Sequence, residues 1–244
     1  MRTNVPCGIR VVAIPSSGRR VELGRLEHGQ HPDALLSRAG WEAESIVSAT
    51  LLTGGALELA YHVTRHSGIR DIDGTDDTDG TDEVVPRDPG IGSDEAGEGY
   101  QRVAAYALVT SDRGALMTQF NSRTHVAGEW GPPGGGLDVG ESPVDGVHRE
   151  VWEETGQRVA LGGLVAISSS HWVGRAPSGI VEDFHAVRIV YRATCPAPQD
   201  IVIHDVDGTT GAARWVPLEQ VRALPLTRSW RDLDALSRLA GPAT

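Results

Sequence analysis

The amino-acid sequence predicts a mixed fold of the α/β (α+β) type, built mainly from strands. Three observations support this prediction. Strand-like segments, with apolar residues alternating or continuous, recur through both halves of the chain. One well-delimited amphipathic helix lies among them, at residues 143–155. An acidic stretch rich in Gly, Thr and Pro, at residues 67–99, divides the elements into two groups.

The chain is long enough for a small domain and a larger one. Its 244 residues are 39% hydrophobic, which is sufficient for a core in each. We expect a small α+β domain at residues 1–66, an acidic flexible linker at 67–99, and the main domain at 100–244. The acidic stretch does not fit a calcium loop, because Thr75 and Asp76 stand where the loop needs an acid or amide and a glycine.

Charge and residue usage exclude several classes of function. The net charge is −11, and residues 70–98, with eleven acidic residues and two arginines, carry −9 of it. This charge disfavours nucleic acid as a partner. All 22 basic residues are Arg, which excludes chemistry that depends on Lys, such as Schiff-base formation. An arginine-only basic set is typical of GC-rich bacterial genomes.

The cysteines and the hydropathy pattern predict a cytoplasmic protein. Cys7 and Cys195 lack metal-type or redox-type spacing and are expected to be free thiols in a reducing compartment. No apolar run approaches the length of a membrane span, so no membrane association is expected.

The N-terminal group of elements is expected to form strands at 11–14 and 20–26, a short helix from His31 to Ala39, and a hairpin across Gly54-Gly55. Its histidines lack the spacing of metal ligands and are expected to be surface or core residues: His28, His31, His62 and His66. We leave three roles open for this unit: formation of a homodimer, coverage of an active site, or recognition of a substrate.

The C-terminal group is expected to contain strands and a final helix around the helix at 143–155. The strands are expected at 102–110, 115–120, 158–168 and 184–193, and the final helix at 229–239. A loop is expected at 171–183.

The helix at 143–155 has clear start and stop signals. Ser142 can cap it, Pro143 fits its first position, and Gly156 ends it. Val144, Val147 and Val151 are expected to form its buried stripe.

On the opposite side, Glu150, Glu153 and Glu154 occur at i, i+3 and i+4, so their carboxylates share a small volume. Oxygen ligands of this kind suit Mg²⁺ or Mn²⁺ rather than Zn²⁺. Glu141 could reach the same ion, and the planar guanidinium of Arg149 could hold one carboxylate in place.

This stretch resembles the Nudix box, the signature of the Nudix (MutT-like) hydrolases. The matching positions are Gly135, Glu141, Arg149, Glu150, Val151, the pair Glu153-Glu154, and Gly156. Gln157 departs from the pattern, because the family usually has an aliphatic residue there. The resemblance covers about residues 100–240 and implies the Nudix α/β/α sandwich with a mixed sheet.

The resemblance also implies an activity. Nudix hydrolases cleave a nucleoside diphosphate linked to another group X, so a small-molecule nucleotide and Mg²⁺, with Mn²⁺ as a substitute, are the expected substrate and cofactor. The metal ligands would be Glu150, Glu153, Glu154 and Glu141. The catalytic base would be Glu153 or Glu154, or a carboxylate on a later loop, for which Glu182 and Asp183 are candidates.

Residues around the box are expected to bind the substrate, by stacking on a base or contacting phosphate: Gly135, Gly136, Arg123, Trp172, Phe184 and His185. Two alternatives are a noncatalytic nucleotide sensor and an isoprenoid diphosphate isomerase of the same fold. A noncatalytic nucleotide sensor usually has eroded box glutamates, which are intact here. An isoprenoid diphosphate isomerase needs a catalytic Cys near the site, and Cys195 is poorly placed for one.

Overall fold

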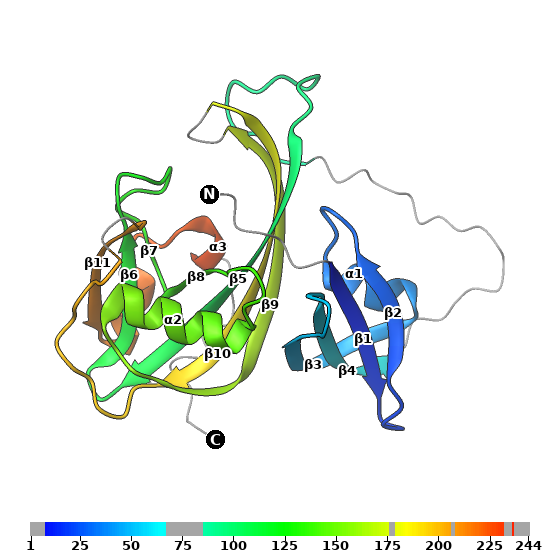
Figure 1. Ribbon diagram of the computed structural model, residues 1–244, viewed down its shortest axis with the longest axis horizontal. Helices are drawn as coiled ribbons and strands as arrows, with labels where there is room; N and C mark the ends of the chain where they lie inside the picture. The colour runs from blue at the N-terminus through cyan, green and yellow to red at the C-terminus, as the bar shows by residue number, and fades with distance from the viewer. Residues whose placement is uncertain (1–7, 67–84, 176–178, 206–207, 232–235, 237–244) are drawn as a thin grey trace. The chain divides into compact units, whose positions relative to one another are not determined.

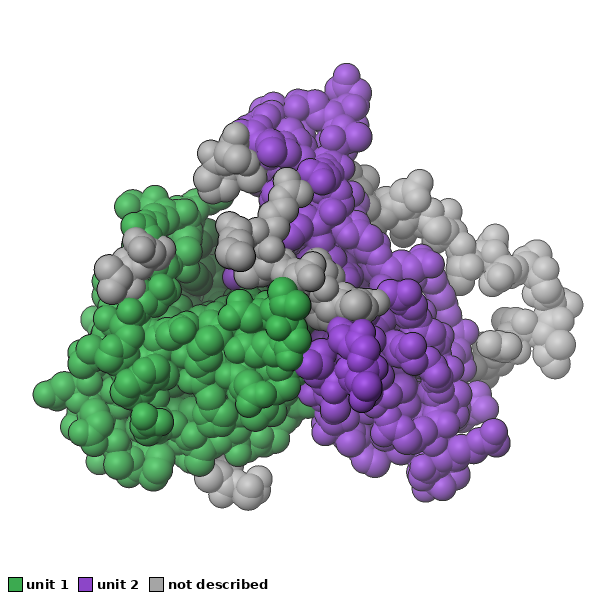
Figure 2. Space-filling view, in the orientation of Figure 1, with its two compact units in different colours: residues 1–4, 103–167, 188–244 green, residues 5–102, 168–187 purple. Residues whose placement is uncertain are grey.

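The computed structural model describes residues 8–66, 85–175, 179–205, 208–231 and 236. The chain forms two compact units, coloured separately in Figure 2. Unit 1 comprises residues 1–4, 103–167 and 188–244, and unit 2 comprises 5–102 and 168–187. The fold is mixed α+β, as predicted, with one sheet of four strands and one of seven.

The four-stranded sheet lies wholly in unit 2 and has the order β2-β1-β4-β3 (Figure 1). Its strands are β1 (Ile9–Pro15), β2 (Val21–Leu26), β3 (Trp41–Leu51) and β4 (Leu57–Arg65). The central strands β1 and β4 run parallel, and the outer pairs are antiparallel. Central strands need apolar residues on both faces, and the buried positions of β1 and β4 provide them.

The hairpin and the short helix of this sheet confirm the sequence prediction. Gly54 and Gly55 both have positive φ, 98° and 83°, as a tight hairpin turn requires. Helix α1 (Pro32–Arg38) begins after His31, whose Nδ1 accepts a hydrogen bond from the Asp33 amide.

Part of the predicted acidic linker is described. Residues 86–88 lie alongside the C-terminal end of strand β9 (Ala160–Arg175). The Asp88 amide donates to the Val173 carbonyl at 2.9 Å, and the Val173 amide donates to the Pro86 carbonyl at 2.8 Å. Residues 67–84 lie outside the described residues. The domain boundaries at 66 and 99 therefore stay a prediction.

The second sheet has the strand order β11-β6-β5-β10-β9, with β7 and β8 paired to β6 and β5. Its strands are β5 (Glu98–Ser111), β6 (Gly114–Phe120), β7 (Trp130–Gly131), β8 (Gly134–Gly136), β9, β10 (Val181–Thr194) and β11 (Thr210–Val216). The expected loop at 171–183 is wrong in extent, because β9 continues to Arg175 and β10 starts at Val181.

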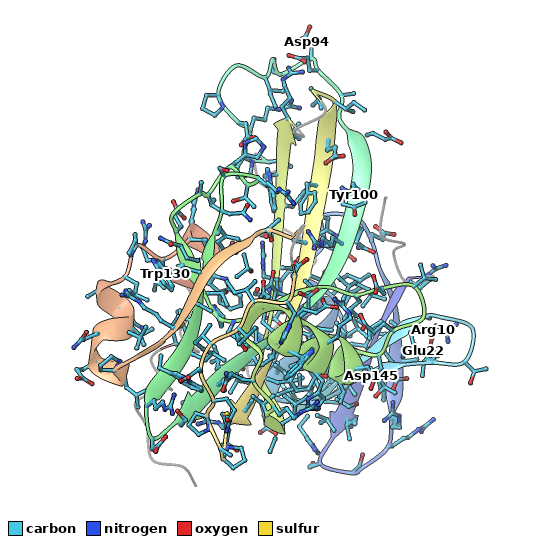
Figure 3. The ribbon with its side chains drawn as sticks, turned by 60° about the vertical axis from the view of Figure 1, so that its left-hand side comes forward. Arg10, Glu22, Asp94, Tyr100, Trp130 and Asp145 are labelled. Carbon is cyan, nitrogen blue, oxygen red and sulfur yellow. The ribbon has the colours of Figure 1, made fainter. Side chains whose placement is uncertain are left out.

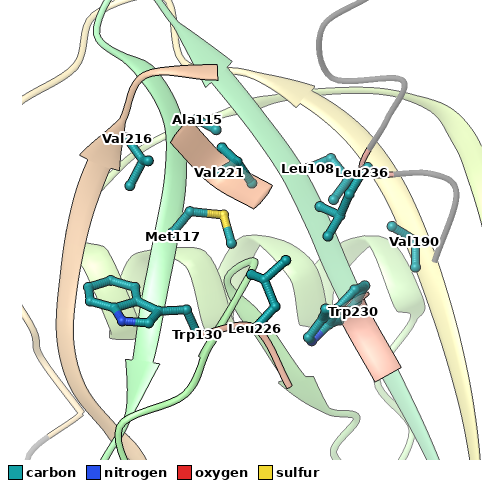
Figure 4. Close-up of a cluster of buried hydrophobic side chains, with 10 residues drawn as sticks. All are labelled: Leu108, Ala115, Met117, Trp130, Val190, Val216, Val221, Leu226, Trp230 and Leu236. Atoms are coloured by element: carbon teal, nitrogen blue, oxygen red, sulfur yellow. The ribbon is translucent and has the colours of Figure 1, made fainter. Parts of the chain in front are cut away.

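Helical segments lie on both faces of this sheet within unit 1. Helix α2 (Pro143–Thr155) is on one face, and the 3-10 helix η1 (Leu218–Ala223) and helix α3 (Arg228–Arg231) are on the other (Figure 4). The core under η1 and α3 contains Leu108, Ala115, Met117, Trp130, Val190, Val216, Val221, Leu226, Trp230 and Leu236. This arrangement is the predicted α/β/α sandwich.

The predicted C-terminal helix at 229–239 is described only in part. Helix α3 covers Arg228–Arg231, and the positions 232–235 and 237–239 lie outside the described residues. Among the helices that the structure describes, none has both the length and the apolar character needed to cross a membrane.

Candidate active site on helix α2

Helix α2 starts and ends where the sequence predicts. Ser142 has extended backbone angles, and its hydroxyl accepts a hydrogen bond from the Asp145 amide at 3.2 Å. Asp145, labelled in Figure 3, lies in the first turn, where a negative charge is favourable. Gly156 closes the helix with φ 69°, a left-handed conformation that favours glycine.

The buried stripe of α2 differs from the prediction at one position. Val147 and Val151 are fully buried, but Val144 is 42% exposed, so its predicted burial is wrong. Val144 lies in the first turn of α2. In this turn the loop that carries Leu137 packs against Gly146 and not against Val144. A methyl group on Gly146 would lie 2.5 Å from a Leu137 side-chain carbon.

The Arg149 side chain organises three of the predicted carboxylates. Its Nε and Nη2 donate to both oxygens of Glu141, at 2.8 and 2.9 Å. Its Nη1 donates to Glu150 at 3.0 Å and to Glu153 at 2.9 Å. Its remaining donor reaches the Gly136 carbonyl at 3.0 Å. The sequence predicts that Arg149 holds one carboxylate, and the structure shows its guanidinium bonded to three. The hydrogen bonds to Glu141 are the main cause that raises the pKa of Arg149.

Glu154 is set apart from the other glutamates by its burial. It is 5% exposed, and its carboxylate accepts hydrogen bonds from the Gly134 amide at 2.9 Å and from the Thr210 hydroxyl. Burial is the main cause that raises the pKa of Glu154 to about 8, and the nearby charges of Glu150 and Asp205 act in the same direction. The hydrogen bonds fix its orientation.

The glycines before helix α2 allow neighbouring groups to lie close to the backbone. A methyl group on Gly135 would lie 2.5 Å from the Glu150 carboxylate. A methyl group on Gly134, whose φ is 144°, would lie 2.4 Å from the Ala105 carbonyl oxygen. Strand β8 therefore passes between β5 and the helix only because it carries no side chains.

Gln157 fills the position where an aliphatic residue is usual in the family. It is 1% exposed, and its amide donates to the carbonyls of Thr155, Gln199 and Asp200 at 3.1, 3.3 and 3.3 Å. Its side-chain oxygen accepts from the Gln199 amide at 2.9 Å. The polar side chain is thus satisfied in the core and ties the segment after β10 to the end of α2.

The segment after β10 also contacts helix α2, and the sequence does not predict this contact. The Glu153 carbonyl accepts hydrogen bonds from the amides of His204 and Asp205, at 2.7 and 3.0 Å. The His204 ring stacks on Trp152 with centroids 4.6 Å apart. These contacts join positions about 50 residues apart, and no local pattern in the sequence marks them.

The predicted substrate-binding residues are divided between the two units. Gly135, Gly136 and Arg123 belong to unit 1, where Arg123 is exposed on the loop after β6 and its amide donates to the Asn121 side chain. The other residues, with the candidate base Glu182, belong to unit 2: Trp172, Phe184 and His185.

Within unit 2 the strands β9 and β10 present two different faces. Trp172 and Phe184 are half-buried and pack together with centroids 4.4 Å apart. His185 is on the opposite face, because side chains alternate along a strand. It is fully buried and hydrogen-bonded to Gln101 and Ser169, each at 2.8 Å. Burial and two neighbouring histidines lower its pKa to about 4, so it is neutral at pH 7.

Cys195 does not have the surroundings of a catalytic thiol. It is 3% exposed, its Sγ lies 3.8 Å from the Gln157 side-chain oxygen, and burial raises its pKa. An isomerase that depends on a reactive cysteine therefore gains no support from the described residues. Cys7 lies outside them.

The chain thus contains an α/β/α domain in which a cluster of glutamates on α2 lies beside the glycine residues of β8. The NUDIX domain family matches residues 100–239, more than half of the 244 residues, and the chain belongs to this family. The prediction of a Nudix domain is confirmed.

Three known proteins are similar to parts of this chain. The m7GpppN-mRNA hydrolase NUDT17 from Bos taurus is 32% identical over 38% of this chain and 31% of its own length. The NAD-capped RNA hydrolase NudC from Pseudomonas syringae is 31% identical over 53% of this chain and 42% of its own length. A MutT protein of solved structure from Methanosarcina mazei is 24% identical, with a TM-score of 0.46, and 59% of this chain matches 96% of it. The chain thus spans less than half of each of these two sequence relatives.

Proposed function

We propose that this protein is a Nudix pyrophosphohydrolase, which uses Mg²⁺ to cleave the diphosphate bond of a nucleoside diphosphate linked to a group X. The observation that carries the proposal is the Arg149 network, which gathers Glu141, Glu150 and Glu153 into one cluster beside the glycine loop. A solvent-exposed acidic helix commonly carries single i,i+4 ion pairs, whereas here one guanidinium joins three carboxylates.

The donor set fits a hard divalent cation. All the candidate ligands are carboxylate oxygens: those of Glu150, Glu153, Glu154 and Glu141. Mg²⁺ prefers such oxygens and keeps several waters, and Mn²⁺ accepts the same set. When bound, these ions would neutralise the charge of the diphosphate and lower the pKa of a bound water.

The residues in and around the cluster have separate roles in the proposed reaction. Arg149 orients the carboxylates through its planar fork. Glu153 is the most accessible member of the cluster, with 38% of its side chain exposed, and is our candidate to accept a proton from the attacking water. Glu182 is the alternative base. The missing side chain of Gly135 leaves room for the Glu150 carboxylate, and contact of Gly135 and Gly136 with the substrate stays a prediction.

The group X is to be identified with a panel of substrates. The names of the relatives mention an mRNA cap and an NAD cap, so both chemistries belong in a substrate panel beside small nucleotides. The negative charge of the chain favours a small nucleotide over a long RNA.

The test is a measurement of product release with Mg²⁺ across nucleoside triphosphates, ADP-ribose, dinucleoside polyphosphates, nucleotide sugars and capped RNAs. Products are separated by ion-exchange chromatography, so the cleaved bond is identified directly. Glu153→Gln and Glu182→Gln separate the two candidate bases. Glu219→Gln, an exposed glutamate on η1, is the matched control.

We expect turnover of one class of substrate, a loss of about 10²-fold or more in Glu153→Gln, and no change in Glu219→Gln. Loss in Glu182→Gln instead would move the base to that residue. If no substrate is cleaved and a nucleotide still binds, the hydrolase proposal fails and the protein is a nucleotide sensor.

A further inference from the structure

A second cluster of ligand-type side chains lies in unit 2, away from the glutamates of α2 in the sequence. His28, His171 and Asp183 bring their ligand atoms to within 4.8 Å of one another. Nε2 of His28 lies 3.1 Å from Oδ1 of Asp183, and Nε2 of His171 lies 2.5 Å from the same oxygen. Each of the three side chains keeps part of its surface exposed to solvent.

The three residues come from segments that are held together by other contacts. His28 lies on the turn between β2 and α1, and the carbonyl of Gln30 in this turn accepts a hydrogen bond from the Ser169 hydroxyl of β9 at 3.1 Å. Gly29 packs on the His171 ring, because a methyl group there would lie 2.5 Å from Nδ1. All these residues belong to unit 2.

A glycine also allows close packing beside Asp183. A methyl group on Gly97 would lie 2.4 Å from the Asp183 amide nitrogen, so the chain before β5 packs directly on the backbone of β10. Glycines thus allow close approach on both sides of the cluster, at Gly29 and at Gly97. The position of the three ligand atoms is therefore supported by backbone packing as well as by their mutual hydrogen bonds.

We propose that His28, His171 and Asp183 form a binding site for a divalent transition-metal ion, with Zn²⁺ as the best match. Two imidazole nitrogens and one carboxylate oxygen are ligands that Zn²⁺ accepts, whereas Mg²⁺ prefers oxygen. Three protein ligands leave a fourth tetrahedral position for water or another ligand.

The geometry is close to that of such a site. Two ligands at about 2.0–2.1 Å from an ion with tetrahedral angles lie about 3.3 Å apart. The two distances to Asp183 Oδ1, 3.1 and 2.5 Å, are within 1 Å of this value. Both histidines direct Nε2 at the same carboxylate oxygen, and the three ligand atoms lie within 4.8 Å of one another, so side-chain shifts that bring all three to the tetrahedral spacing would admit an ion.

His185 lies beside the cluster and supports it without acting as a ligand. Its ring is 5.5 Å from that of His28 and 6.2 Å from that of His171, between centroids. Its two nitrogens are occupied by Gln101 and Ser169. It therefore packs against the ligand rings and limits their rotation.

The experiment is a calorimetric titration of the full chain with Zn²⁺ in excess Mg²⁺, which is added to compete for the carboxylate cluster of α2. Co²⁺ gives an independent spectroscopic readout, because its visible absorption is strong in a four-coordinate nitrogen and oxygen site and weak in a six-coordinate oxygen site. The variants are His171→Ala, Asp183→Asn and His28→Gln. The matched control is His62→Ala, an exposed histidine on β4.

We expect one equivalent of Zn²⁺ that Mg²⁺ does not displace, with an affinity that falls more than about 100-fold in each variant and not in His62→Ala. Zn²⁺ should also raise the melting temperature of the wild type and the control, but not of the variants. His28→Gln changes a partly exposed turn, so it tests the site even if a strand variant fails to fold.

The proposal is overturned if Zn²⁺ does not bind in the presence of Mg²⁺, or if it binds the folded His28→Gln variant as tightly as the wild type. Because the readouts are binding and absorption, the result does not depend on whether the protein hydrolyses a nucleotide.

Discussion

Gly135 and Glu150 are in direct contact: a methyl group on the glycine would lie 2.5 Å from Oε1 of the glutamate. The φ of Gly135 is not in the left-handed region, so a side chain there is excluded by the carboxylate rather than by the backbone. The position of this glycine is therefore a requirement of the glutamate cluster.

Gly135→Ala should displace the Glu150 carboxylate and lower kcat by roughly 10²-fold, because small misplacements of a catalytic group are costly. The measurement is steady-state turnover of the substrate found in the panel, with circular dichroism to confirm the fold. Gly163→Ala is the control, since a methyl group there meets nothing within 4 Å. Equal activity of the two variants would contradict the assignment of Glu150 to the site.

Arg149→Lys should weaken cation binding although the charge is kept. An ammonium group cannot reproduce the planar fork that reaches Glu141, Glu150 and Glu153 together. We expect the Mg²⁺ concentration for half-maximal activity to rise about 10- to 100-fold. Arg222→Lys, an exposed arginine on η1, should leave it unchanged. An unaltered Mg²⁺ requirement in Arg149→Lys would show that the fork does not position the ligands.

Without metal, Glu154 should make stability fall as the pH rises. Its pKa is raised by burial to about 8, from 4.5, so the folded protein binds more protons than the unfolded chain between these values. The free energy of unfolding should decrease across this window with a slope of up to about 1.4 kcal/mol per pH unit.

Urea unfolding in EDTA, repeated at several pH values, measures this slope. Glu154→Gln cannot ionise and should remove most of it, while the other carboxylates still titrate. A slope in Glu154→Gln equal to that of the wild type would mean that Glu154 is not the source.

Gln157→Leu restores the aliphatic residue usual in the family and should nevertheless destabilise this protein. It would leave the Gln199 amide and the carbonyls of Gln199 and Asp200 without their present, partly buried partner. The expected loss is about 1–3 kcal/mol in the free energy of unfolding, with turnover per folded molecule unchanged. Gln220→Leu, at an exposed position, is the comparison. A stabilised Gln157→Leu protein would show that the hydrogen bonds matter less than apolar packing.

The local features of the fold could be predicted from the sequence. Ser142, Pro143 and Gly156 act on neighbouring backbone groups, so the limits of α2 follow from a few residues. The hairpin at Gly54-Gly55 is local in the same way. Val144 shows the limit of this reasoning, because helical periodicity specifies a face but not how far the sheet extends beneath it.

The long-range contacts could not be predicted. Thr210 bonds to Glu154 across 56 positions, and His28 meets Asp183 across 155. No pattern of spacing identifies such partners, since loops and strands of any length can intervene. Gln157 was recognised as a departure from the family, but its hydrogen bonds to Gln199 and Asp200 could be found only in three dimensions.

The alternation of side chains along β10 has an evolutionary consequence. Asp183 and His185 lie on the face of the strand that meets His28. Phe184 lies on the other face, where it packs against Trp172. Deleting one residue from this strand would exchange the two faces at once and damage both. Over time, this stretch can therefore accept changes of residue type more readily than changes of length, and relatives that keep both faces should align here without gaps.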